Sequence, residues 1–260
     1  MIPRTIHQIW LGPDPLPEEH RPWIESWKRH HPDWEHRMWT EDNLPADPVR
    51  REVLDRLRIP VERADILRLE VLYRHGGVYV DTDVECLRPL DDVLAGESFV
   101  GVELKPGRVT NTFIAASAGH VLLERGLREV RPLEVYWTMS SPSDPLKQVA
   151  GPPFLQRLVS GRSDVRLLDP HTFFPSTPEE REQAIAVHHM ARTWHNATTL
   201  RAAMLMAERR LDEANARLAA EQRRHEATQK RLAKLERRLT DAPSRKRGLR
   251  QLLGLPRRYC

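Results

Sequence analysis

The chain has 260 residues, of which 40% are hydrophobic and 30% are charged. This is enough apolar material for one core of ordinary domain size, and it excludes a small disulfide-stapled module. Two cysteines, Cys86 and Cys260, are too few and too far apart for a disulfide framework or a thiolate zinc site. They favour a reducing compartment.

Charge divides the chain into two unlike parts. The formal net charge of +4 is the sum of −6 for residues 1–200 and +10 for residues 201–260. An acidic body is poorly suited to nucleic acid, because neutralisation of phosphates dominates that affinity. The sequence contains no apolar run of membrane-spanning length and opens without a signal-peptide apolar region. We therefore expect a cytoplasmic protein that begins at its first residue and binds no nucleic acid.

Short apolar strands alternate with helices through the body. Strands are expected at residues 5–11, 37–39, 78–80, 98–103, 112–117 and 184–188, and helices at 18–30, 61–75 and 121–130. Gly76 is placed to cap the second helix. Residues 131–164 are rich in proline and predict mostly loop. This alternation predicts an α/β fold.

Beyond Trp194 the apolar residues recur every seven positions. With Ala197 as an a position, ten of the thirteen a and d sites up to Leu239 are apolar, which predicts a long helix or coiled coil of about 65 Å. Residues 245–255 combine leucines with basic side chains, as interfacial helices do. We expect three parts: a body of residues 1–199, a helical extension of 200–243 and a basic amphipathic tail of 244–260.

Residues 200–260 are expected to direct the protein to its location and to mediate assembly. An exposed apolar seam favours pairing with another chain as a homo-oligomer, or folding back on the body. The basic end favours peripheral contact with an anionic membrane on its inner, cytoplasmic face. The alternative is a solvated charged helix, since polar residues interrupt the seam.

The sharpest chemical feature is the pair Asp81 and Asp83, which follows a double glycine and the short strand 78–80. In extended backbone, residues two apart point to the same side, and a strand end places them where a ligand can reach. Two hard carboxylates suit one Mg²⁺ or Mn²⁺ ion, which commonly holds a diphosphate. The alternative is a junction whose aspartates merely cap the next segment.

Three segments together resemble a known family. The run from Arg63 to Glu85 resembles the sugar-nucleotide-binding signature of the family 32 glycosyltransferases. Residues 2–12 resemble the first strand of that family, and residues 186–194 its closing motif. The resemblance implies a GT-A fold and a retaining, metal-dependent enzyme. Its donor would be a UDP- or GDP-hexose, its acceptor a glycan or lipid-linked glycan, and its cofactor Mn²⁺ or Mg²⁺.

The resemblance also implies roles for single residues. Asp81 and Asp83 would be the catalytic carboxylates, Asp83 ligating the metal directly and Asp81 holding ribose and a metal-bound water. His188 would be the late metal ligand, and the neighbouring His189 is its alternative. Further substrate-binding candidates are Trp10, as the surface for base stacking, Asp65 and Arg68, for donor sugar and ribose, Tyr79, Asn111, and Trp194, closing over the diphosphate.

Each of these residues also has a structural explanation. A tryptophan in an opening strand, such as Trp10, is usually a core residue. Arg68 with Asp65 or Glu70 would be an ordinary helix-face ion pair, and Asn111 a polar loop residue. Two rival functions stay open. A strand followed by Asp-x-Asp also fits haloacid-dehalogenase-like phosphatases, in which the first aspartate is the nucleophile. The chain would otherwise be a coiled-coil assembly protein with an inactive head.

Overall fold

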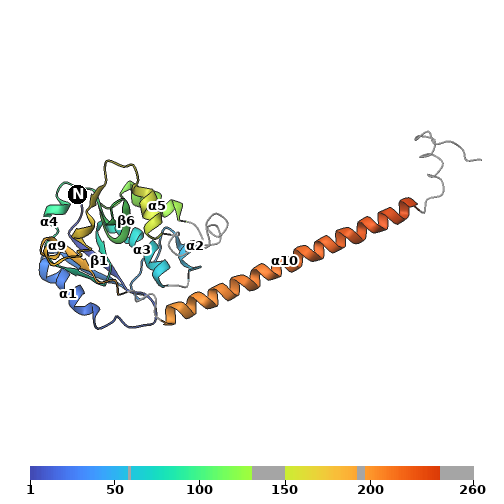
Figure 1. The fold of residues 1–260 in the computed structure, drawn as a ribbon, viewed down its shortest axis with the longest axis horizontal. Helices are drawn as coiled ribbons and strands as arrows, with labels where there is room; N and C mark the ends of the chain where they lie inside the picture. Colours follow the sequence, from blue (N-terminus) through green and yellow to red (C-terminus); the bar gives the residue numbers. More distant parts are fainter. Residues whose placement is uncertain (58–59, 131–149, 192–196, 241–260) are drawn as a thin grey trace, which may run out of the picture. The chain divides into compact units, whose positions relative to one another are not determined.

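The computed structural model describes residues 1–57, 60–130, 150–191 and 197–240 (Figure 1). The chain forms two compact units, Met1–Ala203 and Met204–Cys260. The division into three parts made from the sequence stays a prediction.

The first unit is built on a mixed sheet of six strands in the order β2-β1-β3-β6-β5-β7. These strands are β1 (Thr5–Ile9), β2 (Glu35–Trp39), β3 (Gly77–Val80), β5 (Phe99–Lys105), β6 (Arg108–Ala116) and β7 (Arg166–Leu168). Only β6 runs antiparallel to its neighbours. A second, two-stranded sheet pairs β4 (Val84–Cys86) with β8 (Ala186–His188). The predicted α/β class is confirmed.

Helices cover both faces of the large sheet. Alternate residues of its strands point to opposite faces and belong to two separate hydrophobic cores. On β3, Tyr79 packs in one core with α3, whereas Val78 and Val80 join Trp27 of α1 in the other. Among the described residues before Ala197, the helices are α1 (His20–His30), α2 (Arg51–Leu54), α3 (Pro60–His75), α4 (Asp91–Leu94), α5 (Val121–Glu129), α8 (Pro152–Val159), the 3₁₀ turn η1 (Pro170–Thr172) and α9 (Pro178–Gln183). The sheet is therefore buried on both faces, as its apolar strands require.

The double glycine between α3 and β3 is required by geometry. Gly76 and Gly77 have φ angles of +62° and +96°, a region that side chains disfavour. A Cβ atom on Gly77 would lie 2.5 Å from the carbonyl oxygen of Thr5. The backbone N–H of Gly76 donates to the carbonyl of Leu72 and ends the helix, as predicted.

The expectation of mostly loop over residues 131–164 is wrong where it can be compared. Helix α8 lies in this range, with Pro152 and Pro153 in its first turn and the apolar side chains of Phe154, Leu155 and Leu158 buried. Proline is favoured at the first helical position, because its missing N–H would be unpaired there anyway. Residues 131–149 lie outside the described part of the chain.

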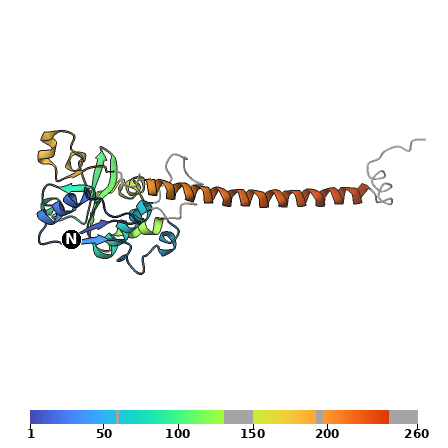
Figure 2. The same cartoon turned by 90° about the horizontal axis from the view of Figure 1, so that it is seen from below.

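The heptad pattern corresponds to one uninterrupted helix, α10 (Ala197–Thr240), in Figure 2. The predicted long helix is confirmed, whereas its pairing as a coiled coil stays a prediction. Among the described residues, no helix combines the length and the apolar character needed to cross a membrane.

Candidate functional site

The two aspartates lie on a tight turn at the carboxyl end of β3. The N–H of Asp81 still donates to the carbonyl of Thr112 on β6, at 3.0 Å, and the N–H of Val84 then donates back to the carbonyl of Asp81, at 3.3 Å. The backbone therefore bends between the two carboxylates, and the expected extended backbone is wrong. It is the turn between β3 and β4 that brings Asp81 and Asp83 together.

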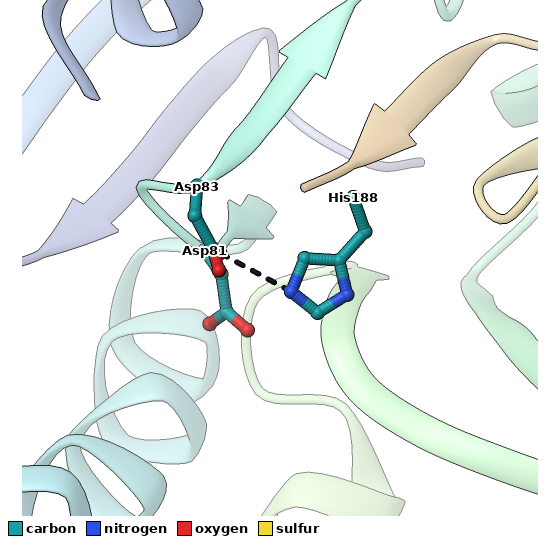
Figure 3. A group of neighbouring side chains, drawn as sticks. All are labelled: Asp81, Asp83 and His188. Carbon is teal, nitrogen blue, oxygen red and sulfur yellow. Dashed lines mark ion pairs between the residues drawn. The ribbon is translucent and has the colours of Figure 1, made fainter. Parts of the chain in front are cut away.

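A distant part of the chain supplies His188 to this turn. Strand β8 pairs antiparallel with β4, and His188 stands opposite Val84, the residue after Asp83. The Nε2 atom of His188 lies 3.2 Å from Oδ1 of Asp83. One potential ligand atom from each of Asp81, Asp83 and His188 lies within 4.8 Å of the others, and Figure 3 shows the three side chains converging.

The electrostatics of this cluster suit a cation. Burial alone would lower the pKa of His188, but the carboxylate of Asp83 outweighs it and raises that pKa. Burial opposes ionisation of Asp83, yet His188 and the N–H of Ala191, at 3.0 Å, hold its pKa below the ordinary value. Carboxylate oxygens and an imidazole nitrogen are ligands that Mn²⁺ and Mg²⁺ accept, so the donor set fits one divalent ion.

Asp81 is held in place by three side chains. Its Oδ1 accepts from the hydroxyl of Tyr79, at 2.7 Å, and from Arg68, at 3.1 Å, and its Oδ2 accepts from the hydroxyl of Thr112, at 2.8 Å. The Arg68 guanidinium also lies 4.5 Å from the centre of the Tyr79 ring. Tyr79 is 2% exposed and thus supports Asp81 from within the core. Its contact with substrate stays a prediction, and this burial does not support it.

Asp65 and Arg68 form a buried pair, not the ordinary surface ion pair of the alternative explanation. Their side chains are 10% and 5% exposed and lie 2.7 Å apart. Burial raises the pKa of Asp65 to about 6, although Arg68 opposes the shift. The side-chain amide of Asn111 donates to Asp65, at 2.7 Å, and the backbone carbonyl of Asn111 accepts from Arg68, at 2.6 Å. Asn111 is a residue of β6, so its expected place in a loop is wrong.

Trp10 lies just beyond the end of β1 and is half-buried, which separates it from the fully buried core tryptophan Trp27. Its indole N–H donates to the carbonyl of Asp14, at 2.8 Å, and its ring meets His20 edge-on at 5.6 Å. Base stacking on Trp10 remains a prediction. Trp194 falls outside the described residues.

Sequence reasoning missed an aromatic group beside the aspartates. His20 contacts the hydroxyl of Thr82, the residue between them, at 3.0 Å. Trp23 stacks on His189 with ring centres 4.2 Å apart, and His189 reaches Glu85 at 3.2 Å. The sequence offers one partial signal, because Trp23, Ile24 and Trp27 recur at helical spacing within the predicted helix 18–30. It offers none for His20, which depends on tertiary packing.

We expect His188→Ala to weaken Mn²⁺ affinity by about tenfold or more and His189→Ala to have little effect. The structure turns His188 toward Asp83 and His189 toward Glu85 and Trp23, so only one imidazole lies in the cluster. The measurement is a Mn²⁺ titration of both variants beside the unchanged protein. Equal losses, or a larger loss for His189→Ala, would reverse the choice of ligand.

The fold and the cluster together define an α/β domain with an Asp-Asp-His cluster at the end of a central strand, and the donor set of this cluster fits a divalent cation. Residues 17–100 match the family model described as a glycosyltransferase sugar-binding region containing a DXD motif. Over these residues the chain is similar to the sugar-binding region of the DXD glycosyltransferases. The resemblance drawn from the sequence is confirmed at this level, without the family number.

Curated relatives carry glycosyltransferase names. Inositol phosphoceramide mannosyltransferase 1 of Schizosaccharomyces pombe is 28% identical over 66% of this chain and 60% of its own length. Mannosyl phosphorylinositol ceramide synthase SUR1 of Saccharomyces cerevisiae is 29% identical over 53% of this chain and 37% of its own. The chain thus spans less than two thirds of the length of either relative.

Solved structures of glycosyltransferases also align with the chain. The ligand-free glycosyltransferase domain of the YGT toxin aligns with a TM-score of 0.48 and 11% identity, covering 64% of this chain and 80% of its own. A glycosyltransferase involved in glycosylation of the major capsid of PBCV-1 aligns with a TM-score of 0.43 and 14% identity, covering 72% and 92%.

Proposed function

We propose that this chain is a retaining, metal-dependent GT-A glycosyltransferase that moves a hexose from a nucleotide-diphosphate sugar to a hydroxyl acceptor. The observation that carries the proposal is the convergence of Asp81, Asp83 and His188 inside a chain that matches the DXD sugar-binding region. A bound Mn²⁺ or Mg²⁺ would neutralise charge on the departing diphosphate. The chain would hold donor and acceptor in reacting geometry and exclude water.

Each site residue has a distinct part in this proposal. Asp83 and His188 ligate the metal, while Asp81 faces the metal and the ribose from a fixed position. Trp10, which is half-buried, would offer its ring for stacking of the base. Arg68, Asp65, Asn111 and Tyr79 are buried, so they act mainly by fixing Asp81.

The names of the relatives narrow the first substrates to test. Two of them are named for mannosyl transfer, and both names contain an inositol-phosphate ceramide. We therefore propose a mannosyl donor and a lipid-linked hydroxyl acceptor as the first pair, with UDP-hexoses and glycan acceptors as the alternatives. The reaction would take place in the cytoplasm or at the inner face of a membrane.

The test is donor hydrolysis against a panel of UDP- and GDP-sugars with Mn²⁺, followed by transfer to acceptors. Thermal protection separates the rival functions, because a ligand that binds the folded state raises its melting temperature. Protection by a nucleotide-diphosphate sugar supports the proposal. Protection by a phosphomonoester alone would favour the phosphatase, and no turnover of any donor would favour an inactive assembly protein.

The C-terminal part is proposed to pair with a second copy and to contact anionic membrane. We expect deletion of residues 200–260 to leave donor hydrolysis unchanged, to yield a monomer, and to abolish binding to anionic vesicles. The reason is that the removed part carries the exposed leucines and a net charge of +10. Vesicle sedimentation with neutral-lipid vesicles as control gives the measurement. Unchanged oligomeric state and vesicle binding would contradict both roles.

A further inference from the structure

Helix α10 (Ala197–Thr240) exposes a row of leucines. Four of them, Leu211, Leu218, Leu232 and Leu235, are each 51–61% exposed. All four occupy a or d positions of the heptad that starts at Ala197. Leucines at these positions lie along one side of a helix, and covering them would be favourable by an amount proportional to the apolar area removed from water. The row therefore needs a covering surface of matching length.

The residues that flank this row have an unequal distribution of charge. One flank, at the g positions, carries an arginine in five successive heptads: Arg210, Arg217, Arg224, Arg231 and Arg238. The other flank, at the e positions, carries Asn215, Gln222, Gln229 and Glu236. One edge of the row is thus uniformly basic, whereas the opposite edge offers amide and carboxylate oxygens.

This distribution discriminates between the two ways in which two such helices can pair. In a parallel pair, each g residue faces the e residue five positions later in the other helix. Arg217 then faces Gln222 of the partner subunit, and Arg231 faces Glu236 of the partner subunit, so each of the first four arginines meets an acceptor. In an antiparallel pair, g residues face g residues, and arginine would oppose arginine along the helix.

We propose that two copies of this chain pair through α10 as a parallel, in-register coiled coil. In register, each of the four leucines meets its own counterpart in the partner. The middle of the row is polar, with Glu221 at d and His225 at a. A shift of one heptad would bury Leu218 against His225 of the partner subunit, so the polar centre penalises other registers.

The parallel arrangement has a consequence for the whole assembly. It brings the N-terminal ends of the two helices, and the chain that precedes each, to one end of the pair. The C-terminal ends of the two helices then lie at the other end of the pair. This inference concerns α10 alone and does not depend on the chemistry at Asp83.

Orientation is tested with the full chain carrying Cys260→Ser, so that single introduced cysteines report alone; Cys86 stays, since it is buried. We expect Leu211→Cys and Leu235→Cys each to form a disulfide-linked dimer with itself on mild oxidation. When the two variants are mixed, a cross-linked heterodimer should be absent, because their cysteines lie about 36 Å apart along a parallel pair. A dominant heterodimer would show an antiparallel pair, and a monomer at micromolar concentration would show that no pair forms.

Added negative charge at the e positions gives an independent test, because it should strengthen a parallel pair and weaken an antiparallel one. Gln222→Glu with Gln229→Glu places carboxylates opposite Arg217 and Arg224 of the partner subunit, so we expect the dimer to bind about tenfold more tightly. In an antiparallel pair the same carboxylates would face one another and weaken it. Ala216→Glu with Ala227→Glu, on the outer side of the helix, adds the same charge and should change the dissociation constant little. Weaker pairing of the first variant, or equal changes in both, would overturn the proposal.

Discussion

Asp83→Asn is expected to lower the rate of sugar transfer by about 10²–10³ while leaving the protein folded. The substitution removes a charged metal ligand from a turn, where its carboxylate contacts only His188 and the N–H of Ala191 among the interactions described above. Asp81→Asn should lower transfer similarly and leave some metal binding. It should also destabilise the protein, because the carboxylate of Asp81 accepts hydrogen bonds from Arg68, Tyr79 and Thr112.

Steady-state kinetics in excess Mn²⁺ and a melting curve measure the two effects separately. Asp92→Asn, in the exposed part of α4, is the matched control for loss of one negative charge and should change neither quantity. If both Asp81→Asn and Asp83→Asn kept near-wild-type activity in excess Mn²⁺, the assignment of the site would be wrong.

The elements around the aspartates could be predicted from sequence because local signals agree there. Helix α3 carries apolar residues at helical spacing, and strand β3 is a short apolar run. The double glycine at their junction occupies positions where a side chain would be strained. The Asp-x-Asp motif after this strand then identifies Asp81 and Asp83 as candidate site residues without any tertiary information. Local pattern and chain geometry lead to the same answer in this stretch.

The completion of the site depends on contacts that sequence does not reveal. Strand β4 has only three residues and gains its partner from β8, about a hundred positions later. The turn that joins Asp81 to Val84 has no glycine or proline to announce it. Thr112 begins the predicted strand 112–117 and Asn111 lies just outside it. Their hydrogen bonds to Asp81 and Asp65 follow from the antiparallel pairing of β6 with β3, which the sequence does not reveal.

Arg68→Met is expected to destabilise the protein by about 3–5 kcal/mol and to abolish transfer. The methionine keeps the apolar stem but removes a cation that lies against Asp65, Asp81 and the carbonyl of Asn111. Two carboxylates would then lack their partner, one of them deeply buried. For a domain of this size the melting temperature should fall by roughly 6–20 °C. Arg68→Lys should recover part of the loss, because a single ammonium cannot bridge as many acceptors as the guanidinium.

The loss of stability in Arg68→Met should depend on pH, because Asp65 titrates. Its pKa in the folded protein is about 6, above the ordinary value of 3.8. The raised pKa means that protonation of Asp65 stabilises the folded state. This stabilisation is fully present below about pH 4 and is lost as the pH rises through 6. Without Arg68 the neutral form of Asp65 is preferred still more strongly. The gap in melting temperature between Arg68→Met and the unchanged protein should accordingly be smaller at pH 5 than at pH 8.

A second substitution identifies Asp65 as the source of this dependence. Asp65→Asn combined with Arg68→Met removes the buried carboxylate, so we expect the double variant to melt above Arg68→Met at pH 8 and to match it closely at pH 5. Transfer should stay absent in the double variant, since Asp81 still lacks its cationic neighbour. An Arg68→Met deficit that is equal at both pH values, and that Asp65→Asn does not relieve, would show that Arg68 stabilises the fold by packing on Tyr79 instead of by pairing with buried charge.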